Sequence, residues 1–110
     1  MTGELNDNYV RLRGRVSNTP EERTLPSGDV LSAFRLVVDR PKGSSRRSRQ
    51  TVDTIDCVAW TSALRKKLAR RAPGDVVEVE GALRRRFSRA GGSGPRSWVS
   101  VELTSLRARP

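Results

Sequence analysis

Hydrophobic residues in most of this chain recur at every second position, and only one short segment has the spacing of a helix. The clearest run is residues 9–16, in which small or apolar residues alternate with Tyr9 and three arginines. Such alternation is typical of a strand with one face against a core. The same pattern predicts strands over residues 30–39, 52–60, 76–87 and 98–106. Residues 18–28, with Pro20, Pro26 and Ser27-Gly28, are predicted to form loop and turn.

The helical segment follows the third predicted strand. Thr61 or Ser62 can cap a helix that runs to about Arg71, with Leu64 and Leu68 on its inner face. The pair Pro73-Gly74 is predicted to end it. Within the 76–87 strand, Gly81 indicates a bulge or bend.

The predicted order is therefore three strands, one short helix and two strands. This order favours an all-β protein, a five-stranded OB-fold Greek-key barrel with the helix between strands 3 and 4. An SH3-like barrel is the nearest competitor, but it lacks a capped helix at that position. A length of 110 residues fits one domain over residues 1–110, with residues 1–8 as a flexible N-terminus.

Positive charge is concentrated in two loops of this predicted barrel. The chain has 22 Lys and Arg against 12 acidic residues, a formal net charge of +10. One Arg-rich loop spans residues 40–50, and another Arg-rich, Gly-rich segment spans residues 84–96. Guanidinium groups pair well with phosphate oxygens, and so basic a chain favours a nucleic-acid partner. An anionic membrane fits less well, because the sequence lacks a long basic amphipathic helix.

Several other classes of function are disfavoured. The chain has no histidine, and Cys57 is its one cysteine, so we expect no metal site, no cofactor and no disulfide within the chain. Glu78 and Glu80 share a strand face, but salt bridges explain them better than paired-carboxylate catalysis. We therefore expect no enzyme and no small-molecule substrate. No secretion signal and no apolar run of about 20 residues is visible, which favours a cytoplasmic protein.

Four segments of the sequence resemble a known family at compatible spacing. They are residues 10–16 (VRLRGRV), residues 20–36 with Pro20-Glu21-Glu22-Arg23 and Phe34-Arg35-Leu36, residues 56–60 (DCVAW), and residues 74–86 (GDVVEVEGALRRR). In this order they are similar to the strands of bacterial single-stranded DNA-binding proteins, and the resemblance covers residues 9 to about 106.

The resemblance implies an OB-fold that assembles as a homo-oligomer, with a tetramer favoured and a dimer possible. It implies sequence-tolerant binding of single-stranded DNA near the nucleoid, in replication, recombination or repair. Bases would stack on aromatic rings while basic loops follow the phosphates. The chain departs from the family at Lys42, Thr54 and Ser88, where tryptophan is common, and it looks like a short form without the acidic C-terminal tail.

The candidate nucleic-acid-binding residues combine these arguments. Trp60 and Trp98 are the stacking candidates, and Arg35 lies on the outward parity of its strand. The complete set is Arg35, Arg46, Arg47, Arg49, Trp60, Arg84, Arg86, Arg89 and Trp98. A second basic stripe, formed by Arg11, Arg13 and Arg15, is read either as a solvated face or as a further DNA contact.

Two alternatives from other classes stay open. An OB-fold can act as a scaffold or as a primosome-type accessory protein with weak nucleic-acid binding. The small aromatic content of 5% keeps that alternative open. An RNA-binding OB protein is the other, because contacts to a 2′-hydroxyl cannot be placed from sequence.

Overall fold

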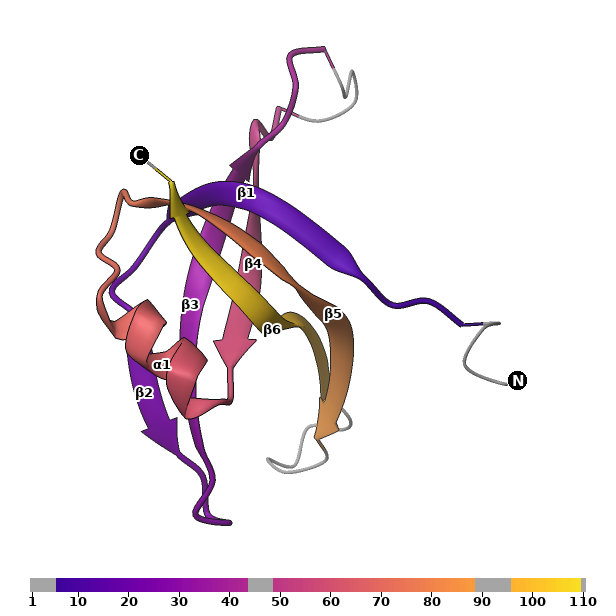
Figure 1. Ribbon diagram of the computed structural model, residues 1–110. Coiled ribbons are helices and arrows are strands. Elements are labelled where there is room, and N and C mark those ends of the chain that lie inside the picture. The colour runs from indigo at the N-terminus through magenta and orange to yellow at the C-terminus, as the bar shows by residue number, and fades with distance from the viewer. Residues whose placement is uncertain (1–5, 44–48, 89–95, 110) are drawn as a thin grey trace.

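A computed structural model describes residues 6–43, 49–88 and 96–109 of the chain (Figure 1). Its elements are β1 (Val10–Val16), β2 (Glu21–Thr24), β3 (Val30–Asp39), β4 (Val52–Ala59), α1 (Ser62–Ala69), β5 (Val76–Ser88) and β6 (Arg96–Arg109). No helix in the described ranges is long and apolar enough to cross a membrane. The mostly-β class and the position of the helix are confirmed.

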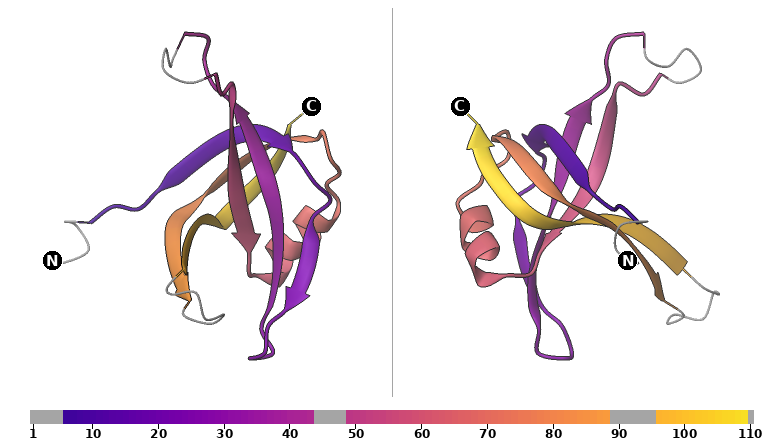
Figure 2. Two further views of the ribbon diagram at one scale, coloured as in Figure 1. Left: turned by 180° about the vertical axis from the view of Figure 1, so that it is seen from behind. Right: turned by 45° about the vertical axis from the view of Figure 1, so that its right-hand side comes forward.

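The six strands form one strongly curved sheet in the order β1-β5-β6-β4-β3-β2 (Figure 2). Neighbouring strands are antiparallel, except that β4 and β6 run parallel. β1 lies along β5 from Val10 to Arg15, and its last two residues also pair with Leu36 and Val37 of β3. Because β1 contacts both β5 and β3, the sheet curls around a single core.

The alternating residues predicted to face inward form that core. Val16 on β1, Phe34 and Leu36 on β3, and Cys57 and Ala59 on β4 are buried. Their outward neighbours, such as Arg11, Arg35 and Asp56, are exposed. A side-chain period of two therefore determines which face of each strand contacts the core.

Helix α1 covers one end of the core, where its inner residues Leu64 and Leu68 are buried. The Thr61 hydroxyl accepts a 3.2 Å hydrogen bond from the backbone N–H of Leu64, which satisfies one otherwise unpaired donor at the start of the helix. Gly74, with φ of 94°, provides the left-handed turn that leads into β5. The predicted cap at Thr61 is confirmed, and the helix ends at Ala69, slightly before the predicted Arg71 and ahead of the Pro73-Gly74 turn.

The predicted strand count was wrong, because the structure has six strands rather than five. The additional strand, β2, lies in the segment expected to be loop, and its four residues are all exposed. It pairs with β3 from Glu21↔Ala33 to Thr24↔Val30. An edge strand that buries no side chain has no hydrophobic alternation, so its backbone pairing left no signal in the sequence.

The β5–β6 hairpin is longer than predicted and extends past the core. The pairing register shifts between Glu80 and Gly81, which confirms the predicted bulge. A Cβ at Gly81 would lie 2.8 Å from the backbone carbonyl carbon of Glu102, so a side chain has no room there. Beyond this point, Val99 and Phe87 keep the inward parity but are exposed, since the core ends before them.

The N-terminal segment continues the edge of β1. Residues 1–5 of the segment expected to be flexible lie outside the described residues. The Asn8 side-chain amide donates to the carbonyl of Leu83 and accepts from its N–H, both at 2.8 Å. This side chain therefore replaces one backbone pairing between β1 and β5.

Candidate nucleic-acid interface

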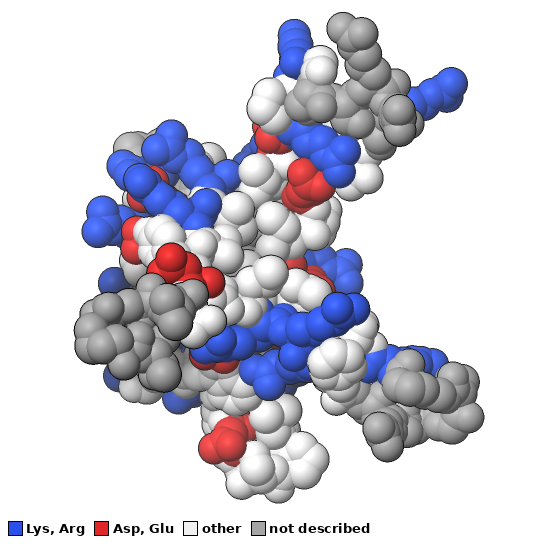
Figure 3. Space-filling view, turned by 90° about the vertical axis from the view of Figure 1, so that its right-hand side faces the viewer, with Lys and Arg blue, Asp and Glu red and all other residues white. Residues whose placement is uncertain are grey.

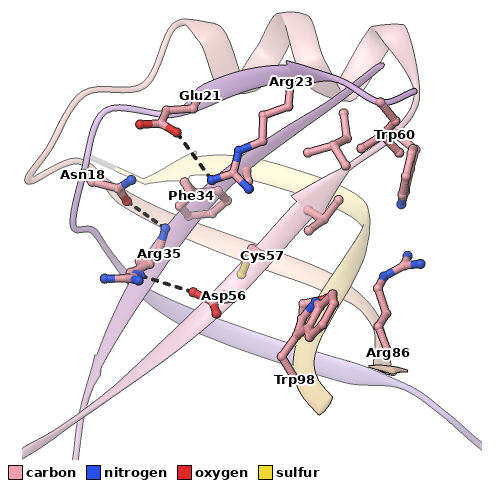
Figure 4. A pocket seen from close by; sticks show the side chains of 15 residues that line it. Asn18, Glu21, Arg23, Phe34, Arg35, Asp56, Cys57, Trp60, Arg86 and Trp98 are labelled. Carbon is pink, nitrogen blue, oxygen red and sulfur yellow. Dashed lines mark hydrogen bonds and ion pairs between the residues drawn. The ribbon is translucent and has the colours of Figure 1, made fainter. Parts of the chain in front are cut away.

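A groove of about 650 Å³ lies on the outer face of the curved sheet (Figure 4). It is lined by the outward-facing residues of adjacent strands. From β2, β3, β4, β6 and their flanks these include Arg23, Leu31, Ala33, Arg35, Asp56, Val58, Trp60, Trp98 and Ser100, with Arg86 of β5 at one side. On β3 and β4, the groove-facing side chains alternate with residues that face the core. Two of those core residues, Phe34 and Cys57, also belong to the lining.

Two tryptophans border this groove. Trp60 follows the last residue of β4 and is half-buried, whereas Trp98 on β6 is 47% exposed. The Arg86 guanidinium lies 5.6 Å from the centroid of the Trp60 ring, and Arg86 pairs directly with Trp98 across the hairpin. Figure 4 shows Arg86 pointing toward Trp60. The structure thus places three of the predicted site residues together, an arrangement that suits base stacking.

Arg35 lines the groove on its outward face, as its parity predicted, and lies at the side opposite Trp60 and Arg86 (Figure 4). Its backbone N–H donates to the Asn18 side chain at 2.8 Å, and its guanidinium pairs with Asp56 at 3.3 Å. Arg23 pairs in the same way with Glu21 at 3.5 Å. These side chains are more than half exposed, so their remaining N–H donors stay open to an incoming anion.

Arg84 and Arg86 share one carboxylate. Glu102 of β6 lies 3.7 Å from Arg84 and 3.6 Å from Arg86, and all three side chains are partly exposed. A single carboxylate thus holds two cations at the side of the groove. Seen from the face in Figure 3, Lys and Arg side chains form a band, and the surface is hollowed beside it.

The remaining predicted arginines belong to the segments that the sequence assigned to loops. Arg49 is exposed at the end of the loop between β3 and β4. Arg46, Arg47 and Arg89 lie outside the described residues. The structure therefore assembles Arg35, Trp60, Arg84, Arg86 and Trp98 around one groove and its side. Their contact with DNA stays a prediction.

Two further residues, Arg23 and Phe87, were not among the predicted site residues. Arg23 lies on β2, and the one signal for it was a charge alternation, from Glu21 to Arg23, within a predicted loop. Phe87 is 69% exposed, and the Arg85 guanidinium lies 5.5 Å from its ring centroid. Phe87 lies on the same face of β5 as the buried Val77 and Val79, so its exposure depends on where the core ends.

The basic stripe of β1 is held by acidic residues of the same chain. Arg11, Arg13 and Arg109 lie 3.2, 3.4 and 3.0 Å from the Glu78 carboxylate, which is only 4% exposed. The hydrogen bond from Arg109, with the nearby charge of Arg11, lowers the pKa of Glu78 to about 2 despite its burial. Arg15 pairs with Asp39 at 2.9 Å. This stripe forms a network inside the chain, separate from the groove.

The acidic side chains and Cys57 are the groups that a metal site or a reactive thiol would use. In the described ranges, no three His, Cys, Asp or Glu residues gather closely enough to hold a metal ion. Burial raises the pKa of the Cys57 thiol to about 12, which makes the thiolate scarce at neutral pH.

This curved sheet, with a helix between β4 and β5 and a groove on its outer face, places the chain in the OB-fold class. The match to a family profile then gives the identification: residues 7–105 match the "Single-strand binding protein family". The chain therefore belongs to that family.

Individual relatives agree with this assignment. The chain is 31% identical over 93 residues to "Single-stranded DNA-binding protein 3" of Listeria innocua, covering 84% of this chain and 57% of that protein. It is 44% identical over 54 residues to a "Single-stranded DNA-binding protein" of Fusobacterium nucleatum, covering 48% of this chain and 35% of the relative. The chain thus spans about a third to three fifths of these relatives' lengths.

A solved structure has the same fold. "Plasmodium falciparum SSB complex with ssDNA" superposes with a TM-score of 0.80 at 22% identity, over 96% of each chain. At that identity the likeness supports the fold alone.

Proposed function

We propose that this protein binds single-stranded DNA with little sequence preference. The observation that carries the proposal is the groove in which Trp60, Trp98 and Arg86 lie together. Aromatic rings provide stacking surfaces for any base, and the arginines provide donors for phosphates. Family membership over residues 7–105 supports the same function.

The mechanism combines base stacking with counterion release. Arg23, Arg35, Arg84 and Arg86 lie in or beside the groove, and the arginines predicted in the loops add to them. If about four to six phosphates are neutralised, log K against log salt falls with a slope of about −3 to −4. Ionic contacts carry much of the affinity, because aromatic residues make up only 5% of the chain.

The wider assignments follow from this function. We propose that residues 1–110 form one nucleic-acid-binding domain without catalytic activity. It would hold or protect single strands during replication, recombination or repair, in the cytoplasm at the nucleoid. The relatives' names support a binding role rather than an enzymatic one.

We also propose that the protein works as a homo-oligomer, with a tetramer favoured over a dimer. Leu83, Phe87 and Val99 share one face of the β5–β6 hairpin and are 49%, 69% and 46% exposed. Contact with a second copy would remove this apolar surface from water. Light scattering of the wild type and of Phe87→Ser tests it: a monomeric wild type would contradict the proposal.

A competition assay tests the binding proposal. Fluorescence anisotropy of a labelled oligo-dT is followed while unlabelled oligo-dT, duplex DNA of equal length or oligo-U is added. We expect oligo-dT to displace the label at much lower concentration than duplex. Equal displacement by oligo-U would instead favour an RNA-binding OB protein, and no binding of the label would favour a scaffold.

A further inference from the structure

Helix α1 lies beside β6 (Figure 1). A second concave surface, away from the groove, lies where the end of this helix meets that strand. It has a volume of about 310 Å³, and we call it the helix-end hollow. Its lining consists of Lys67, Arg70, Arg71, Leu106, Arg107 and Ala108. Every polar side chain in this lining is cationic, and the remainder is small or aliphatic.

Most arginines of the described chain are paired with acids, but this hollow is an exception. Ion pairs hold Arg11, Arg13, Arg15, Arg23, Arg35, Arg40, Arg65, Arg84, Arg86 and Arg109. In the hollow, only Arg71 has an acidic partner among the described residues, Asp75 at 4.0 Å. Lys67, Arg70 and Arg107 line one concavity, and among the described residues none of them has an acidic partner within 4.0 Å.

Helix geometry explains only part of this arrangement. Cations near the end of a helix are favoured by its carbonyl dipoles, which accounts for Lys67 and Arg70. It does not account for Arg107, which comes from β6 and lies directly opposite Glu78 in the sheet. Glu78 forms ion pairs with Arg11, Arg13 and Arg109, whereas Arg107 lines the hollow and forms no such pair with it. Like charges gathered from two elements repel each other unless an anion joins them.

We infer that the helix-end hollow binds backbone phosphates of a single strand that leaves the groove beside Trp60. This inference rests on the proposed function. α1 begins next to Trp60, whose carbonyl accepts a 3.2 Å hydrogen bond from Arg65, and the hollow lies at the other end of the helix. At about 1.5 Å per residue the two ends are about 10–14 Å apart. A single strand can therefore span from the Trp60 end of α1 to the hollow within a few nucleotides.

The chemistry of the hollow favours phosphates over bases. Guanidinium groups bind phosphate oxygens in a bidentate manner, and Lys67 adds a point charge. The lining contains no aromatic ring, so it offers no surface for base stacking. An acidic polypeptide would present similar charges, but a strand is favoured because the groove and the hollow lie at opposite ends of one helix.

The test compares two oligonucleotide lengths. An oligo-dT of about 8 nucleotides fills roughly one OB-fold site, and one of about 30 extends beyond it. The variants are Lys67→Gln, Arg107→Gln and their combination. The matched control is Lys66→Gln, which removes the same charge from the same helix outside the hollow. Affinities are measured over a range of salt concentrations.

We expect the double variant to reduce the magnitude of the salt slope by about 1.4 on the long oligonucleotide, since each lost phosphate contact removes about 0.7. The short oligonucleotide should bind all variants equally, which also shows that they are folded. The control should keep the wild-type slope on both lengths. The inference would be overturned if the double variant reduced the salt slope equally on the short and the long oligonucleotide. It would also be overturned if the Lys66→Gln control reduced the slope as much as the double variant.

Two further outcomes separate a failure of this inference from a failure of the proposed function. If the double variant loses affinity for a poly-glutamate peptide but not for long oligo-dT, the hollow serves an acidic protein partner and the inference is wrong. If the wild type fails to bind the short oligonucleotide, the proposed function itself fails.

Discussion

Replacing Glu102 with glutamine should tighten the binding of single-stranded DNA. This carboxylate lies 3.7 Å from Arg84 and 3.6 Å from Arg86, so both arginines are partly neutralised before a strand arrives. A phosphate that binds either arginine must compete with Glu102. The amide of Glu102→Gln keeps the shape of the side chain but removes that competition.

The size of the effect follows from the exposure of the pairs. The three side chains are 48%, 42% and 32% exposed, so solvent screens both interactions. Exposed ion pairs contribute about 0.2–1 kcal/mol each, and two of them give about 0.4–2 kcal/mol. The dissociation constant should therefore fall by about 2- to 30-fold at low salt, and the gain should shrink as salt screens the pairs.

Titration of oligo-dT followed by tryptophan emission measures this change. The matched control is Glu22→Gln, which removes a carboxylate paired with Arg65 at 3.5 Å outside the groove. It should change the affinity much less. Unchanged or weaker binding by Glu102→Gln, with a native melting temperature, would show that Arg84 and Arg86 do not contact the strand.

Other predictions concern stacking, pH, packing and reactivity. Trp60→Ala should weaken oligo-dT binding by about 5- to 150-fold, since one stacked base contributes about 1–3 kcal/mol, and wild-type affinity would show that Trp60 is structural. Because the pKa of Glu78 is lowered from 4.5 to about 2, its carboxylate stabilises the fold at pH values above 4.5, and this stabilisation is lost as the pH falls toward about 2. Urea midpoints of Glu78→Gln should therefore vary less with pH across that window than those of the wild type. Gly81→Ala should lower the melting temperature strongly, because its Cβ would lie 2.8 Å from the Glu102 carbonyl carbon; an unchanged melting curve would show that the bulge can relax. Cys57, with its pKa raised to about 12 by burial, should react with iodoacetamide only after unfolding, as mass spectrometry can show.

Local periodicity predicted much of the fold. The alternation in residues 10–16 and the spacing of Leu64 and Leu68 depend on neighbours a few residues away, and the structure confirms both. β2 could not be predicted in this way, because its stability comes from backbone pairing with β3 and none of its side chains is buried. The exposure of Val99 and Phe87 likewise depends on where a core built from distant segments ends.

The candidate site was predictable by residue type more than by arrangement. Arg35 and Trp60 could be assigned to an outward face from parity alone. The contact between Arg86 and Trp60 could not be predicted, because it depends on how the β5–β6 hairpin lies against β4. The partners of Glu78 depend on the register of β1 and β6 against β5, which no single-strand pattern specifies.

The central claim is that the groove stacks the bases of a single strand, and tryptophan emission tests it most directly. The wild-type protein is titrated with oligo-dT and with duplex DNA of equal length, at low and at moderate salt. Trp60 and Trp98, which both line the groove, are the two tryptophans of the chain. We predict strong quenching by oligo-dT that persists at moderate salt, and little quenching by the duplex. Equal, fully salt-sensitive binding of both without quenching would contradict this account and indicate only a basic surface.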